Sequence, residues 1–222
     1  MNALFPVTDA TFRQIRTDGS TVKQWQAPEL NLKAKVVCAT CNNGWMSDLE
    51  NHHAKPAMAD LILGKRVGAM SNKRVRGLSL FAFKTAVVAN RSLPEEEFFF
   101  HRSDRYAFRK SFTIPTDVQM WLVGMQPFAG GQIGSHNVYF PNKDAARLTL
   151  NVCSFCVGCL GFQIVSAKSV KAGKVESFPA HANLTTCFYP TLEANVRWPR
   201  PTVLSTEAFN DFANRWNMVR HR

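Results

Sequence analysis

The sequence predicts an α+β protein in which helices come early and an antiparallel sheet follows. Residues 47–90 carry apolar side chains at helical spacing, whereas residues 118–167 contain runs rich in Val, Phe, Tyr, Trp and Thr that are bounded by Gly, Pro and Asn. The two patterns are segregated along the chain, which favours an antiparallel sheet. With 222 residues, 45% hydrophobic and 19% charged, the composition is that of a globular chain with one good core.

The first elements are expected to be short strands. Residues 11–15 and 21–25 flank the turn Thr17-Asp18-Gly19-Ser20 and predict a hairpin, and residues 33–37 predict a third strand. A helix should follow, with Ser47 as N-cap and Glu50 completing a capping box. Side chains of this helix that fall at helical steps are Met46, Leu49, His53 and Ala57.

Proline and glycine punctuate the next segments. Pro56 is expected to kink the first helix or to divide it, and Gly64 is a suitable C-terminal stop. Residues 78–90 predict a core helix, with Leu80, Phe83, Ala86 and Val87 on one face. We place a boundary here, between a region at 1–64 and an α+β domain at 65–222.

Strand-like runs dominate the second half of the chain. We expect strands at residues 98–101, 118–125, 137–140, 148–157 and 160–167. The tail begins with the extended segment Trp198-Pro199-Arg200-Pro201. Ser205 should cap a last helix that carries Phe209, Phe212 and Trp216 on one face.

The formal charge of +11 comes from 27 Lys and Arg against 16 Asp and Glu, which favours polyanionic partners. The densest basic stretch is a candidate nucleic-acid contact, and its alternative is a solvated loop face; it contains Lys65, Arg66, Lys73, Arg74 and Arg76. The sequence contains no apolar run of about 18 residues and no signal-peptide pattern at residues 1–10. We therefore expect a cytoplasmic protein without a membrane partner, and an oligomer of identical chains stays open.

Six cysteines do not form the pattern of a disulfide framework. Cys38 and Cys41 are three apart, which lets two thiolates hold one edge of a tetrahedral zinc ion. Cys153, Cys156 and Cys159 repeat this step, but apolar neighbours favour core packing over metal binding, and strand alternation puts Cys156 on the face opposite the other two. Cys187 is also expected in the core.

The segment around the first cysteine pair carries a specific resemblance. The run C-x2-C-N-N-G-W-M-S-x-L-E, from Cys38 to Glu50, resembles a family of bacterial HNH-endonuclease-like proteins. The resemblance extends loosely over most of residues 30–217. It includes Lys55-Pro56, Lys84-Thr85-Ala86, a Trp-containing strand at 118–122 and Trp198-Pro199.

This resemblance implies a ββα-metal nuclease element and metal-dependent hydrolysis of DNA. Four cysteines would hold a structural Zn²⁺, a histidine would act as general base, and an acidic residue with a helix-start Asn or His would hold Mg²⁺ or another divalent ion. Cys38 and Cys41 correspond to the second zinc pair, and Asn42 to the residue at the start of the helix. The alternative for Asn42-Asn43-Gly44 is a turn with a structural role only.

The rest of the family pattern is missing from residues 1–37, which contain no cysteine and no histidine. A misplaced start codon, a domain supplied by another chain, or decay of the motif would each produce this. His53, with its neighbour His52, is the candidate replacement for the base, and its alternative is a polar surface residue. We therefore expect a nuclease-like protein that is inactive alone; the other readings are a non-catalytic nucleic-acid- or partner-binding module and an inert fragment.

Overall fold

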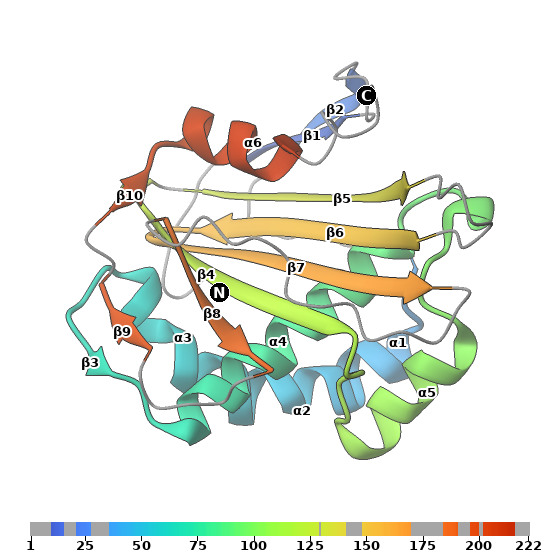
Figure 1. Ribbon diagram of the computed structural model, residues 1–222, viewed down its shortest axis with the longest axis horizontal. Coiled ribbons are helices and arrows are strands. Elements are labelled where there is room, and N and C mark those ends of the chain that lie inside the picture. Colours follow the sequence, from blue (N-terminus) through green and yellow to red (C-terminus); the bar gives the residue numbers. More distant parts are fainter. Residues whose placement is uncertain are drawn as a thin grey trace.

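An antiparallel sheet forms the centre of the structure, with α1 to α5 below it and α6 above it (Figure 1). The computed structural model describes residues 10–15, 21–27, 36–128, 130–140, 148–169, 184–190, 196–199 and 202–215. The sheet follows the order β10-β4-β7-β6-β5, and β8 also pairs with β4. Its strands are β4 (Val118–Met125), β5 (Gly131–Phe140), β6 (Leu148–Val157), β7 (Leu160–Ser169), β8 (Thr185–Tyr189) and β10 (Val203–Leu204). The predicted α+β class with an antiparallel sheet is confirmed, and β10–β4 is a parallel pair within it.

The outer edge of β4 is shared by two later strands. β8 pairs antiparallel with Met120 to Val123, and β10 pairs parallel with Gly124 and Met125. The side chains of β4 are almost fully enclosed, with Val118, Leu122 and Val123 each 0% exposed. The edge of β4 is therefore closed by residues that lie far along the chain.

Strands β6 and β7 are buried on both faces, which explains their nearly continuous apolar sequence. Along β6, Cys153 and Phe155 pack into the cluster between the sheet and α4, whereas Val152 and Cys156 belong to clusters on the opposite face. The period of two is that of a regular strand.

The helices on the lower face pack against this sheet. α4 (Asn72–Asn90) begins at Ser71, whose hydroxyl accepts a hydrogen bond from the N–H of Arg74 at 3.3 Å. Its residues Val75, Leu78 and Phe83 are 0% exposed. The remaining helices are α1 (Ala39–Cys41), α2 (Ser47–Leu49), α3 (Lys55–Ile62), α5 (Arg102–Ser111) and α6 (Thr206–Asn214), and a 3-10 turn lies at Glu95–Glu97. No helix in the described part of the chain is both long enough and apolar enough to cross a bilayer.

One helical segment runs from Ala39 to Ile62, through α1, α2 and α3. Two π-helical turns, Asn42–Met46 and Glu50–Ala54, interrupt its regular hydrogen bonding, and the chain kinks at Gly44. Pro56 does not divide the helix, because it is the second residue of α3, in the first turn after the second π-turn. The helix stops at Gly64 as predicted, where φ is +69°.

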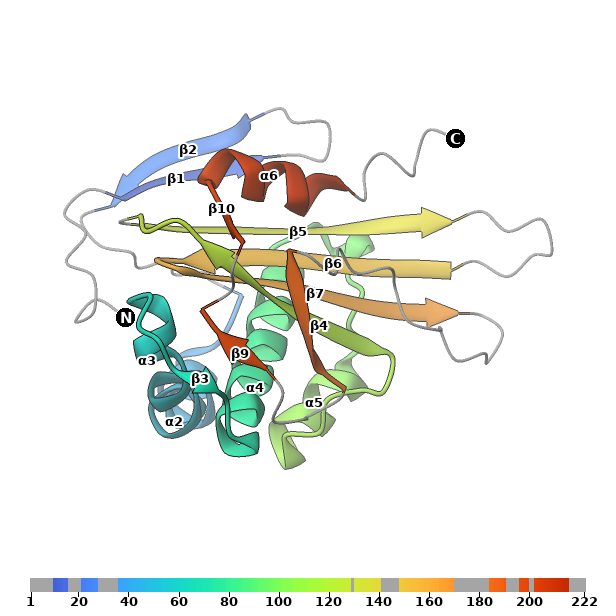
Figure 2. The same ribbon diagram turned by 60° about the vertical axis from the view of Figure 1, so that its left-hand side comes forward.

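The hairpin at the start of the chain is confirmed as β1 (Ala10–Ile15) and β2 (Thr21–Ala27), and its turn lies outside the described residues. Figures 1 and 2 show this hairpin beside α6 and away from α2 and α3. A ββα element requires its two strands to pack against its helix. β1 and β2 therefore do not form such an element with the helix that follows Cys38 and Cys41 (the cysteine turn).

Several other expectations were wrong. Val36 and Val37 form a turn and not the end of a strand, and residues 33–35 lie outside the described part. The helix begins at Ala39 with Cys38 as N-cap, so Ser47 lies inside it. The segment 98–101 is not a strand, and α5, which directly follows it, was not predicted.

The expected helices at 78–90 and after Ser205 are confirmed. α4 starts six residues earlier than predicted, and α6 is capped by Ser205, whose hydroxyl accepts from the N–H of Ala208 at 3.2 Å. Phe209 and Phe212 are buried as expected, and Trp216 lies outside the described residues. The main core cluster includes both Leu49 to Ile62 and residues of α4 and the sheet, so the core continues across the boundary placed at residue 64.

Candidate metal centre

The cysteine pair lies on the first turn of the helix that starts at Ala39. Cys38 is the N-cap, and its Sγ accepts a hydrogen bond from the N–H of Cys41 at 3.4 Å. Both thiols are free; Cys38 is exposed and Cys41 is half-buried. One exposed helical turn therefore carries both sulfur atoms, an arrangement that suits one edge of a tetrahedral zinc ion.

The electrostatics of this turn favour a thiolate. The pKa of the Cys38 thiol is lowered, mainly because the backbone N–H of Cys41 donates to its sulfur, and the positive charge of Arg109 in α5 adds to the effect. Metals bind the thiolate and not the thiol, so the lowered pKa favours metal binding near neutral pH.

Among the described residues, no further ligands for a closed zinc site accompany Cys38 and Cys41. Within the described ranges, no group of three or more His, Cys, Asp and Glu side chains could hold a metal ion. Cys38 and Cys41 thus fit zinc as half of a donor set, and the described residues do not fit a catalytic divalent ion.

Asn42 directly follows the second cysteine, and its side chain is exposed. Its Nδ2 donates to Oδ1 of the neighbouring Asn43 at 3.3 Å, and not to an acidic residue or a histidine. The helix kinks two residues later, at Gly44.

His53 lies further along the same helix, in the second π-turn. A separation of eleven residues corresponds to about 16 Å along a helix axis, so the structure does not bring His53 to Asn42. Its ring contacts the edge of Phe112, with centroids 6.0 Å apart. The neighbouring His52 places Nδ1 2.9 Å from the carbonyl oxygen of Asp48.

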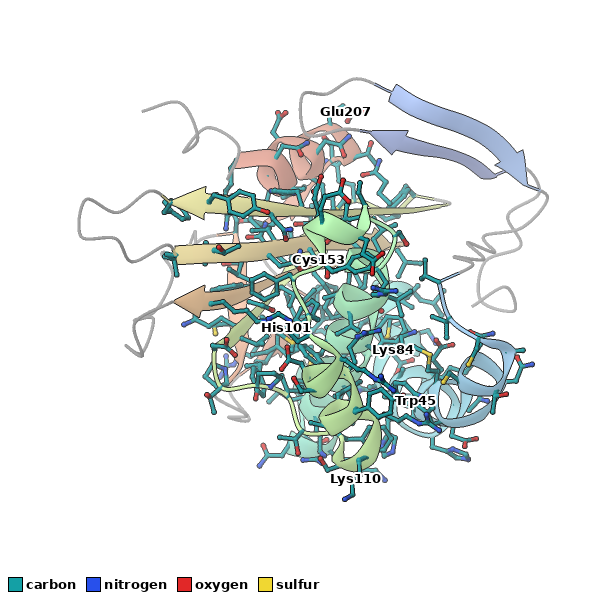
Figure 3. The ribbon with its side chains drawn as sticks, turned by 90° about the vertical axis from the view of Figure 1, so that its right-hand side faces the viewer. Trp45, Lys84, His101, Lys110, Cys153 and Glu207 are labelled. Atoms are coloured by element: carbon teal, nitrogen blue, oxygen red, sulfur yellow. The ribbon has the colours of Figure 1, made fainter. Side chains whose placement is uncertain are left out.

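An aromatic cluster joins this helix to α5. The ring of Trp45 lies 5.9 Å from that of Phe108 and 6.4 Å from that of Phe112. Phe108 is the one buried residue of α5, and burying a phenylalanine contributes about 1.5–3 kcal/mol. Figure 3 shows Trp45 beside α5, with Lys110 at the end of that helix.

An ion pair fixes the same helix to α4. Lys84 donates to the carboxylate of Glu50, and its side chain is only 12% exposed. The ammonium also lies 4.8 Å from the ring centroid of Phe81. The cysteine turn is therefore carried by a helix that is held on two sides, by α4 and by α5.

The basic residues predicted to contact nucleic acid lie at the other end of this helix, beyond Ile62. Two of them share one acidic partner: Lys65 lies 3.5 Å and Arg74 3.2 Å from the carboxylate of Asp60. The others, Arg66, Lys73 and Arg76, are exposed. The structure thus separates this basic stretch from Cys38 and Cys41 by the length of the helix (Figure 1).

Sequence reasoning missed the residues that do lie beside the cysteine turn. α5 carries four basic side chains, and its Arg109 and Tyr106 interact electrostatically with Cys38 and Cys41. A helix with a single buried residue has no apolar stripe, which is why periodicity did not reveal it. The available signal was local: Asp104, three residues after His101, accepts from the His101 N–H at 2.9 Å.

The other four cysteines lie on or next to strands of the sheet. Cys153 and Cys156 are buried on opposite faces of the sheet, and burial raises the pKa of each thiol to about 12. Cys159 is also buried, beside Gly64. The expectation that Cys187 lies in the core was wrong, because it is exposed on β8, where its thiol donates to the carbonyl of Tyr189 at 3.2 Å.

Comparisons of this chain with models of protein families, with curated proteins and with solved structures found no match.

Proposed function

We propose that this protein is HNH-endonuclease-like, acts on DNA, and contributes half of a structural zinc site to a nuclease centre. The observation that carries the proposal is the cysteine turn, in which Cys38 caps a helix and accepts the N–H of Cys41. The run from Cys38 to Glu50 supplies the family resemblance, and the net charge of +11 supports a polyanionic partner.

In this proposal Cys38 and Cys41 hold one edge of the zinc ion, and two further ligands come from outside the described residues or from a second copy of this chain. Bound there, zinc would cross-link the cysteine turn to the segment that supplies those ligands. Asn42 would lie at the rim of the completed centre. We assign no hydrolytic step to this chain, because the described residues around Asn42 include no neighbouring base or carboxylate cluster.

The first test is the zinc content of the purified protein by elemental analysis. We expect about one zinc per chain if the other ligands come from the same chain, or about half if two copies share a tetrahedral site. Cys38→Ser should abolish zinc binding, whereas Cys187→Ser, which changes the exposed cysteine of β8, should leave it intact. A wild-type protein without zinc, or a Cys38→Ser variant that retains it, would contradict the proposal.

A second candidate function is a nucleic-acid-binding module without catalysis. The position of His53, the candidate general base, favours this function. Its ring packs on Phe112 and lies about three turns of helix from Asn42, so the two residues do not meet. Incubation with plasmid DNA and Mg²⁺ or Mn²⁺, alongside binding assays at two salt concentrations, separates the two functions. Salt-sensitive binding without cleavage, in protein that contains zinc, supports the module; metal-dependent cleavage supports the nuclease.

A further inference from the structure

The outward face of α5 concentrates positive charge. At 100° per residue, Arg102, Arg105, Tyr106, Arg109 and Lys110 fall within an arc of about 140° around the helix axis. Phe108 and Asp104 lie outside this arc, and Phe108 anchors the opposite side of the helix in the core. The face is therefore basic with one aromatic side chain and no acidic residue.

These charges are not neutralised within the described part of the chain. No ion pair between described residues involves the basic residues of α5, and the acidic residue of the helix, Asp104, pairs with Lys168 at 3.2 Å. The pKa of Arg105 is lowered, mainly by burial. The like charges of the neighbouring Arg91 and Arg102 lower it further. Concentrated, unpaired cations of this kind favour a polyanion as partner.

The helix is also held rigidly in place. The side-chain oxygen of Asn90, at the end of α4, accepts hydrogen bonds from the N–H groups of Phe99 at 2.9 Å and Phe100 at 3.3 Å, just before α5 begins. Lys168 of β7 contacts both the carbonyl of Phe99 and the carboxylate of Asp104. A preformed surface loses little conformational freedom when a ligand binds.

The aromatic content of the face distinguishes between nucleic acids. Tyr106 is 53% exposed, and its hydroxyl accepts from Arg102 Nη2 at 3.4 Å. Proteins that bind single strands stack successive bases on several aromatic rings, whereas this face offers one. Arginines along a straight helix, with Arg102 and Arg109 about 10.5 Å apart along the axis, suit the regular phosphates of a duplex.

We propose that the exposed face of α5 binds the phosphate backbone of double-stranded DNA, next to the Cys38–Cys41 turn. The choice of DNA as the ligand rests on the proposed function. The position of the surface rests on charge and packing alone, and it replaces the stretch at residues 65–76, where Asp60 already pairs with two of the basic residues. Contacts of this kind position the duplex and do not read its sequence.

The test is fluorescence anisotropy of the full chain with a labelled duplex of about 20 base pairs over a series of salt concentrations. The variant Arg102→Gln with Arg109→Gln removes two exposed charges from the face. We expect a loss of affinity on the order of tenfold, and a decrease of about 2 in the slope of log affinity against log salt. The matched control, Lys55→Gln with Arg197→Gln, removes two exposed charges elsewhere and should stay within about twofold of wild type.

Each of the remaining outcomes contradicts either the position of the binding surface on α5, the choice of DNA as ligand, or the proposed function. If the α5 variant binds like wild type while Lys73→Gln with Arg76→Gln loses affinity, the surface is at residues 65–76 and not at α5. If all three double variants weaken binding equally, the charge acts diffusely and α5 is not a site. If wild type binds a duplex of RNA more tightly than DNA, the ligand class is wrong. If wild type binds no nucleic acid, the proposed function itself fails. Unchanged melting temperatures of the variants show that folding is intact.

Discussion

Gly77 lies where α4 crosses the helix of the cysteine turn, and its replacement by alanine tests how closely the two helices approach. A Cβ atom at this position would lie 2.5 Å from the backbone carbonyl oxygen of His53 and 3.1 Å from Cβ of Ala57. Real Cβ atoms essentially never come within 3.0 Å of another heavy atom, so the two helices would have to separate by at least 0.5 Å. Because the closest atom belongs to the backbone, no side-chain rotation can relieve the contact.

Two opposing effects determine how much Gly77→Ala changes the free energy of unfolding. Overpacking a well-filled core costs about 1–3 kcal/mol, and a backbone contact belongs in the upper part of this range. Alanine is the better helix former, which returns about 1 kcal/mol. The expected net effect of Gly77→Ala is a loss of about 1–2 kcal/mol in the free energy of unfolding. For a chain of this size that lowers the melting temperature by roughly 2–8 °C.

Urea denaturation followed by circular dichroism measures this loss. Arg76→Ala is the matched control, because it introduces alanine at the preceding, exposed position of the same helix. Its free energy of unfolding should stay within about 0.5 kcal/mol of wild type. A Gly77→Ala protein that is more stable than wild type would show that the helices are not in contact here, and the described packing of the cysteine-turn helix would then be wrong.

Three further outcomes follow from individual side chains. Asn90→Ala leaves the N–H groups of Phe99 and its neighbour without their acceptor, and should cost about 2–3 kcal/mol of unfolding free energy in urea denaturation. After chelation of metals, a maleimide reagent at pH 7 should label Cys38 faster than it labels a free model thiol, because the pKa of Cys38 is lowered. Cys153 should stay unlabelled in the native protein, because burial raises its pKa to about 12. Mass spectrometry of peptides identifies the labelled site. Asp117 is exposed, but partial desolvation of its carboxyl raises the pKa, so its ionisation is disfavoured in the folded state. Asp117→Asn should therefore stabilise the protein at pH 7, and the advantage should vanish as the pH falls below the unfolded-state value near 3.9; equal melting temperatures of variant and wild type at pH 7 would contradict this.

The sheet was the most predictable part of the fold. β6 has the bounds that its sequence pattern indicated, because strands buried on both faces require long runs of apolar and β-branched residues. The short strands β8 and β10 were not predicted, since their pairing with β4 depends on residues distant in the chain. Sequence periodicity contains no information about such partners.

The candidate site was predictable only in its local part. The spacing of Cys38 and Cys41 identified the turn, but a thiol is not among the usual N-cap groups, and Ser47 was the more conventional choice. α5 reaches the turn through the contact of Trp45 with Phe108, two residues far apart in sequence. Because a single buried phenylalanine anchors α5, the basic face was invisible to any pattern based on apolar spacing.

The shared edge of β4 has a consequence for the order in which the protein can be built. β4 ends at Met125, whereas β8 begins at Thr185 and β10 at Val203. At 5–20 residues per second, a ribosome needs roughly 3–12 s to make the chain between the end of β4 and the start of β8. During that interval a nascent sheet presents an unpaired, apolar edge, which is the kind of surface that promotes association between chains. The C-terminal strands thus complete the sheet and also end its exposure to wrong partners.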